Sequence, residues 1–149
     1  MSLNMLMGQY RNTLDEKGRI MYPSKLRSVL ADNEVVVTQG LDKCLMIFTP
    51  DYWMQLNEKI MGSVSLFNNQ NLSVMRRFLG PAQSVEFDKS GRLSIPQGLR
   101  DYAGLKGECV IIGLNKYMEL WDAEAYQQYL EQTESSFDEA KMSMSSILL

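Results

Sequence analysis

The chain contains no histidine and only two cysteines among its 149 residues. Without histidine, the sequence lacks the usual general base of catalytic triads and the imidazole ligands of most zinc sites. Cys44 and Cys109 both fall in stretches typical of buried strands, so we expect two core thiols and no disulfide framework. These absences exclude histidine-dependent triads, zinc sites and a disulfide framework.

Long apolar runs are also missing. No segment approaches the roughly eighteen apolar residues that a membrane span needs, and 45% hydrophobic with 22% charged residues is typical of a globular protein in water. Residues 1–4 carry no charged or apolar region of a signal peptide, and we expect them to be an expression scar, with Met5 or Met7 as the natural start. These absences predict a cytoplasmic protein with no membrane partner.

The net charge of −3 is unevenly distributed along the chain. From Asp122 onward there are six acidic residues and one lysine, whereas residues 1–121 carry a net charge of +2. The acidic balance of the whole chain argues mildly against a nucleic-acid partner, but the distribution permits one.

One short motif occurs twice. Leu14–Ile20 reads LDEKGRI, and Phe87–Leu93, 73 residues later, reads FDKSGRL. Residues 14–53 align with residues 87–126 without a gap, and their apolar positions stay in phase. A unit of about 40 residues can hardly bury a stable core by itself. We therefore expect the two copies to share one core.

Both copies predict the same succession of elements: a strand, a Gly turn, a second strand ending at proline, a short helix, a β-hairpin and an amphipathic helix. The hairpins are predicted at residues 34–48 and 108–121. The closing helices are predicted at residues 51–61 and 122–130, where Thr49 and Asp122 are candidate N-caps. Between the copies, residues 62–71 are expected to form a loop and residues 72–79 a short helix. On that helix Arg76 and Arg77 are expected to face solvent, with a phosphate contact as the alternative.

These elements predict a single domain over residues 5–132. It would consist of repeat 1 (7–61), a helical linker (62–79) and repeat 2 (80–131). Residues 133–149 are rich in Ser, Glu, Asp and Met, and we expect them to form a frayed helix or a disordered tail, with packing of the apolar end on a neighbouring subunit as the alternative.

Each Asp-x-x-Gly-Arg motif predicts a tight turn. The aspartate can accept backbone N–H groups of the turn, the glycine can take a positive φ, and the arginine can pair with the aspartate. That explanation needs no function. Two copies, however, would place two basic loops side by side across a pseudo-twofold axis, and such a pair suits a twofold-symmetric ligand such as DNA.

The chain resembles the MraZ family from about residue 7 to residue 131. The resemblance rests on the paired motifs, on the Pro-x-x-Leu-Arg segments at residues 23–27 and 96–100, and on the strand Tyr117–Trp121. MraZ proteins are bacterial transcriptional regulators encoded at the head of the division and cell wall gene cluster. The resemblance implies an α+β fold, namely a duplicated AbrB-like swapped-hairpin β-barrel that is pseudo-twofold within one chain and has short flanking helices.

The resemblance also implies partners and site residues. The expected partners are double-stranded DNA, at short direct repeats in the promoter of the protein's own operon, and further copies of the chain in a ring, commonly an octamer. A cytoplasmic, nucleoid-associated location follows from this, and a regulator of this kind is expected to have no enzyme activity, no metal, no cofactor and no small-molecule substrate. The DNA-binding residues carried over from the family are Lys17, Gly18, Arg19, Ser90, Gly91 and Arg92, and Lys89, next to Ser90, is counted with them. Asp15 and Asp88 would brace the turns.

The two loops differ at one position. Because Ser90 stands where the first copy has Lys17, we expect the first loop to contribute more to binding. On the side chains alone, arginine can bind two phosphate oxygens or a guanine edge, and lysine acts as a point charge toward phosphate.

Two other classes of function can be weighed against DNA binding. An aspartic-protease-like pair of Asp15 and Asp88 would need a small hydroxyl residue and a glycine directly after each aspartate, and the arginine four residues on would keep each carboxyl ionised. A protein–protein interaction module of the same fold, antitoxin-like or a scaffold, would bind a partner through the helices at 51–61 and 122–130. Such a module has no need of two matched Gly-Arg loops.

Overall fold

The structure is a computed structural model that describes residues 5–148, so the predicted scar at residues 1–4 lies outside the described residues. Its elements in chain order are β1 (Leu6–Thr13), β2 (Arg19–Met21), α1 (Ser24–Arg27), β3 (Glu34–Gln39), β4 (Leu45–Phe48), α2 (Pro50–Ser63), α3 (Asn69–Val74), the π-helical turn η1 (Met75–Leu79), β5 (Gln83–Glu86), β6 (Arg92–Ser94), α4 (Gln97–Ala103), β7 (Glu108–Asn115), β8 (Tyr117–Asp122), α5 (Ala123–Gln132), α6 (Glu134–Ser143) and α7 (Ser145–Leu148). The stretch expected to be a frayed or disordered tail forms α6 and α7 up to Leu148.

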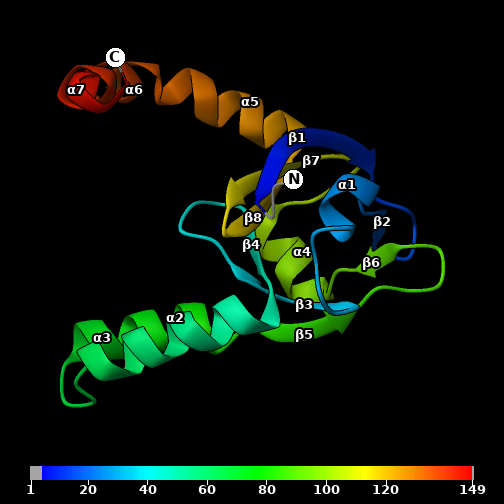
Figure 1. Ribbon diagram of the computed structural model, residues 1–149, viewed down its shortest axis with the longest axis horizontal. Coiled ribbons are helices and arrows are strands. Elements are labelled where there is room, and N and C mark those ends of the chain that lie inside the picture. Colours follow the sequence, from blue (N-terminus) through cyan, green and yellow to red (C-terminus); the bar gives the residue numbers. More distant parts are fainter. Residues whose placement is uncertain (1–4, 149) are drawn as a thin grey trace.

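The strands form two antiparallel sheets (Figure 1). Six strands pair in the order β1-β7-β8-β4-β3-β5, and β2 pairs with β6 in a separate two-stranded ladder. The predicted α+β class is confirmed. The edge strands β1 and β5 do not pair with each other within residues 5–148, so the sheet does not close there, and the expected swapped-hairpin barrel is not confirmed.

Most strand pairings join the two copies of the repeat. Of the six pairings within residues 5–148, four link a strand of the first copy to one of the second: β1 with β7, β3 with β5, β4 with β8, and β2 with β6. The other two, β3 with β4 and β7 with β8, are the hairpins predicted from the sequence. Neither copy therefore completes a sheet from its own strands.

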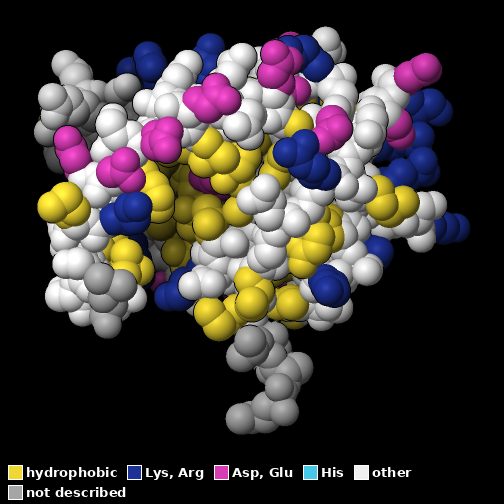
Figure 2. All heavy atoms as spheres, turned by 90° about the horizontal axis from the view of Figure 1, so that it is seen from above, with side chains coloured by type: hydrophobic (Ala, Val, Ile, Leu, Met, Phe, Trp, Pro, Cys, Tyr) yellow, Lys and Arg dark blue, Asp and Glu magenta, His cyan; other side chains and the backbone are white. Residues whose placement is uncertain are grey.

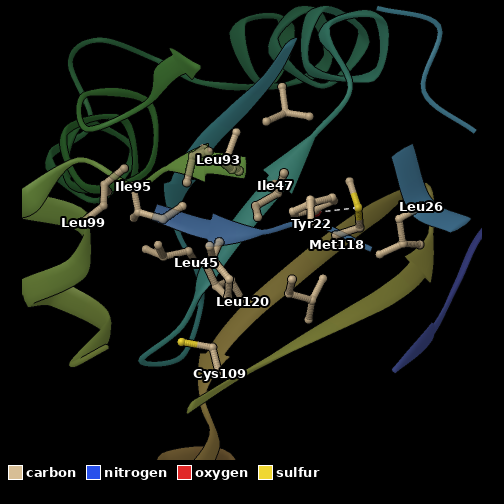
Figure 3. Close-up of a cluster of buried hydrophobic side chains, with 14 of the residues drawn as sticks. Tyr22, Leu26, Leu45, Ile47, Leu93, Ile95, Leu99, Cys109, Met118 and Leu120 are labelled. Atoms are coloured by element: carbon tan, nitrogen blue, oxygen red, sulfur yellow. Dashed lines mark hydrogen bonds between the residues drawn. The ribbon is translucent and has the colours of Figure 1, made fainter. Parts of the chain in front are cut away.

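Alternation along the central strands sends side chains to two faces of the sheet. In β3, Val35 and Val37 face a core shared with the β2–β6 ladder, α1 and α4, whereas Val36 faces the opposite side. Figure 3 shows side chains from both copies meeting in this shared core. There the fully buried Tyr22 hydroxyl donates a hydrogen bond to Met118 Sδ at 2.8 Å. The shared core expected from the duplication is present.

The opposite face of the sheet is covered by α2 and α5. Trp53 of α2 packs on Phe48 with ring centroids 5.2 Å apart, and Tyr129 of α5 packs on Trp121 at 4.9 Å. Both helices begin at the predicted caps, because Thr49 accepts a hydrogen bond from the Tyr52 N–H and Asp122 accepts one from the Ala125 N–H. None of the helices in residues 5–148 combines the length and the apolar character of a membrane span.

The two cysteines are buried and free, as predicted. Burial raises the pKa of the Cys109 thiol to about 12 and raises that of Cys44 as well. A thiol in such surroundings stays protonated and unreactive.

The segment between the copies is more helical than predicted. Helix α2 continues to Ser63, and α3 already begins at Asn69 because the Asn68 side chain accepts hydrogen bonds from the N–H groups of Gln70 and Asn71. The predicted loop over residues 62–71 is therefore wrong at both ends. The helix predicted at residues 72–79 is split between α3 and η1, and Arg76 and Arg77 are exposed as predicted.

Candidate nucleic-acid interface

The first Asp-x-x-Gly-Arg loop connects β1 to β2. Asp15 Oδ1 accepts hydrogen bonds from the backbone N–H groups of Lys17 and Arg19, each at 2.9 Å, and Asp15 Oδ2 accepts one from Arg19 Nε at 2.8 Å. Gly18 has a φ of +78°, and its N–H donates to the Asp15 carbonyl at 3.0 Å. The positive φ explains why glycine stands here, since other residues adopt it at a cost.

The second loop, between β5 and β6, repeats this geometry almost atom for atom. Asp88 Oδ1 accepts from the Ser90 and Arg92 backbone N–H groups at 2.9 Å each, and Oδ2 accepts from Arg92 Nε at 2.9 Å. Gly91 has a φ of +85°. The two sequence motifs therefore encode one loop conformation twice.

The hydrogen bonds within the loops hold both carboxylates in the charged form. The backbone N–H of Arg19 lowers the pKa of Asp15 below its ordinary value of 3.8, and the Arg19 side chain and the Lys17 N–H act in the same direction. The backbone N–H of Arg92 does the same for the pKa of Asp88, helped by its side chain and by the Ser90 N–H. Each aspartate is thus paired with the arginine of its own loop, unlike two acids that share a proton.

The two loops lie at opposite ends of the β2–β6 ladder. In this antiparallel pair Arg19 faces Ser94 and Arg92 faces Met21, so each loop leads into one end of the ladder. Both loops project to the side of the molecule away from α2, α3, α6 and α7 (Figure 1). Lys and Arg side chains gather at this same right-hand end in Figure 2.

The predicted contact residues differ in exposure. The side chains of Lys17, Lys89 and Ser90 are exposed, and those of Arg19 and Arg92 are partly buried against their aspartates. Gly18 and Gly91 are buried. The glycines therefore set the backbone conformation of the loops, while the lysines and arginines provide positively charged groups at the surface.

The loops also contact two arginines that were not predicted as site residues. A Cβ atom built on Gly18 would lie 2.5 Å from Arg100 Cζ, and one built on Gly91 would lie 2.6 Å from Arg27 Cζ. Each guanidinium comes from the copy that does not contain the loop. The sequence held a signal for them, because Arg27 and Arg100 end the repeated Pro-x-x-Leu-Arg segments, but it gave no sign that they reach across.

The described residues offer no other obvious chemistry at this end of the molecule. No group of three or more Cys, Asp or Glu side chains within residues 5–148 is arranged to hold a metal ion. What the loops present is a set of lysine and arginine side chains on two rigid turns, an arrangement suited to anionic oxygens.

Comparison with known proteins places the chain in a family. A family model described as "MraZ protein, putative antitoxin-like" matches residues 5–76 and 78–146. A protein of Treponema denticola named Transcriptional regulator MraZ is 51% identical over 142 residues, which is 95% of this chain and 99% of that protein. Proteins of the same name from two strains of Treponema pallidum are 41% identical over 134 residues, covering 90% of each chain. The chain therefore belongs to the MraZ family.

Proposed function

We propose that this protein is a sequence-specific DNA-binding transcriptional regulator that acts on short direct repeats in the promoter of its own division and cell wall operon. The relatives' printed name supports the regulatory role. The observation that carries the proposal is the pair of loops with matching hydrogen bonds, each with an arginine held by an aspartate. The location that follows is the cytoplasm, in association with the nucleoid.

The arginine geometry supports contact with DNA. Within residues 5–148, the guanidinium of Arg19 bonds to Asp15 through Nε, which leaves its two terminal nitrogens for a phosphate or for O6 and N7 of guanine. Arg92 has the same arrangement with Asp88. Lys17 and Lys89 add exposed point charges for the phosphate backbone. Arginine would then read bases or fork on phosphates while the lysines fix position.

One chain supplies few contacts, so the proposal includes an oligomer. Each phosphate contact steepens the dependence of log K on log salt concentration by about 0.9, and two to four contacts from one chain would bind weakly. A homo-oligomeric ring, commonly an octamer in the resemblance noted above, would present several loops to repeated DNA boxes and gain through effective concentration. The crossed strand pairings support a swapped-hairpin origin of the single domain over residues 5–132, with its repeats at 7–61 and 80–131 and its linker at 62–79.

Fluorescence anisotropy tests the proposal directly. The wild type and the Arg19→Ala/Arg92→Ala double variant are titrated against the upstream region of the protein's own operon and against a scrambled duplex, across a salt series. We expect tight, salt-sensitive binding that prefers the operator and is lost in the double variant. Tight operator binding retained by the variant would contradict a role for the loops.

Equal, weak binding to both duplexes would instead favour the interaction-module alternative. A Lys59→Ala variant is a suitable control, because it removes one exposed positive charge from α2, on the other side of the molecule. Loss of binding in this control would show a general charge effect and not a loop effect.

A further inference from the structure

Each loop is contacted by two residues of the opposite copy of the repeat. The carbonyl oxygen of Gly18 accepts a hydrogen bond from the Ile95 N–H at 2.9 Å. The carbonyl oxygen of Ile95 accepts one from Arg100 Nη1, and this guanidinium lies against Gly18. Gly18, Ile95 and Arg100 therefore form a closed ring of contacts at the first loop, although Arg100 follows the second loop in sequence.

The second loop has the same ring of contacts with the two copies exchanged. The Gly91 carbonyl accepts from the Tyr22 N–H at 3.1 Å, and the Tyr22 carbonyl accepts from Arg27 Nε at 3.2 Å. The Arg27 guanidinium lies against Gly91. Gly91, Tyr22 and Arg27 lie 73 residues from Gly18, Ile95 and Arg100, respectively. The same set of contacts therefore occurs once at each loop.

The charge balance shows what these arginines add. Residues 15–19 contain two acidic and two basic side chains and are neutral, whereas residues 88–92 contain one acidic and two basic side chains and carry +1. Within residues 5–148, neither Arg27 nor Arg100 forms an ion pair with a carboxylate, so each brings a full positive charge to the loop it touches. The first loop becomes net positive only through Arg100.

We propose that Arg100 and Arg27 are positioning residues that hold the DNA-binding loop of the opposite copy in place and that each adds one positive charge at that loop. The part that concerns DNA rests on the proposed function, whereas the locking concerns the free protein. Binding by one loop then depends on both copies of the repeat.

Hydrogen exchange of the free protein tests the locking without DNA. In Arg100→Ala, we expect the amides of Gly18 and Arg19 to exchange about tenfold faster, since losing about 1.4 kcal/mol of local stability has that effect, while those of Gly91 and Arg92 stay unchanged. Arg27→Ala should show the reverse pattern. A response in the loop of the same copy, an equal response in both loops, or no response would overturn the proposal.

The amides of the central strand β7 are the internal control for folding. If Arg100→Ala speeds exchange in β7 as well, Arg100→Lys replaces it. The lysine keeps the charge but lacks the planar guanidinium, so the Gly18 amide should still exchange faster than in the wild type. Protection of that amide equal to the wild type would contradict locking by the guanidinium.

A double-mutant cycle tests the consequence for DNA. Arg100→Ala should weaken operator binding about tenfold in the wild type and in Lys89→Ala, but clearly less in Lys17→Ala, because only residues acting on one site are non-additive. Equal losses in both lysine backgrounds would overturn the crossed assignment. If neither the wild type nor any variant binds the operator, the proposed function fails. The exchange experiment still tests whether Arg100 and Arg27 hold the loops of the opposite copy.

Discussion

Gly18 has a positive φ, which only glycine adopts without strain, and the Arg100 guanidinium lies against it. We expect Gly18→Ala to lower the free energy of unfolding by about 1–2 kcal/mol, because the positive φ is costly for alanine and the Arg100 guanidinium would have to move away from the new Cβ. Gly98→Ala is the matched control. Gly98 lies in α4 with open space around it, so alanine there should stabilise by about 0.5 kcal/mol. Urea denaturation measures both, and equal effects would refute the argument.

The two loop aspartates predict a specific pH dependence. Their pKa values are lowered on folding, so the charged carboxylates stabilise the folded state above their ordinary pKa of 3.8, and this stabilisation is lost as the pH falls through the lowered values. We expect Asp15→Asn/Asp88→Asn to be less stable than the wild type at pH 7, with the difference closing below about pH 3.8. Urea midpoints from pH 7 to pH 3 measure it. A difference that stays constant over this range would count against the loop hydrogen bonds, and Asp32→Asn, at an exposed carboxylate outside both loops, is the control.

At the scale of elements, the start of α2 could be predicted from its local sequence alone. Thr49 caps the helix, Pro50 begins it, and the helix covers one face of the sheet. We expect Thr49→Ala to cost about 1 kcal/mol of stability, and Thr49→Ser to cost much less because it keeps the capping hydroxyl. Thermal unfolding of the two variants measures the difference, and similar losses in both would point to packing of the threonine methyl group instead.

Other elements were predictable to the extent that their signals are local. The hairpins, both capped helices and the Gly turns follow from β-branched runs, caps and glycines, all of which act over a few residues. The Asn68 cap that starts α3 early was missed because the surrounding Ser and Asn residues are also typical of a loop. The reach of Arg27 and Arg100 could not be predicted, since it depends on which copy each strand joins.

At the scale of the whole molecule, the duplicated sequence predicted a shared core but not whether the sheet closes into a barrel. Apolar phase fixes which side chains are buried, and the alternation of Val35, Val36 and Val37 onto two faces follows from it. Phase does not decide whether β1 meets β5 or whether β2 and β6 form a ladder of their own. The barrel was therefore expected from the family resemblance alone, and the pattern of residues did not predict it.

The crossed pairings make a prediction about cutting the chain. A protease site inserted between Leu66 and Phe67, in the exposed segment between α2 and α3, would separate β1–β4 from β5–β8. We expect the two fragments to stay together on size-exclusion chromatography and to keep the near-ultraviolet circular dichroism of Trp53 and Trp121, because four strand pairings join them. The second fragment made alone contains only Trp121 and should lose the near-ultraviolet signal of that residue, since β7 would lack β1 and β8 would lack β4. Fragments that separate under native conditions, each with its own folded spectrum, would show instead that each copy builds its own core.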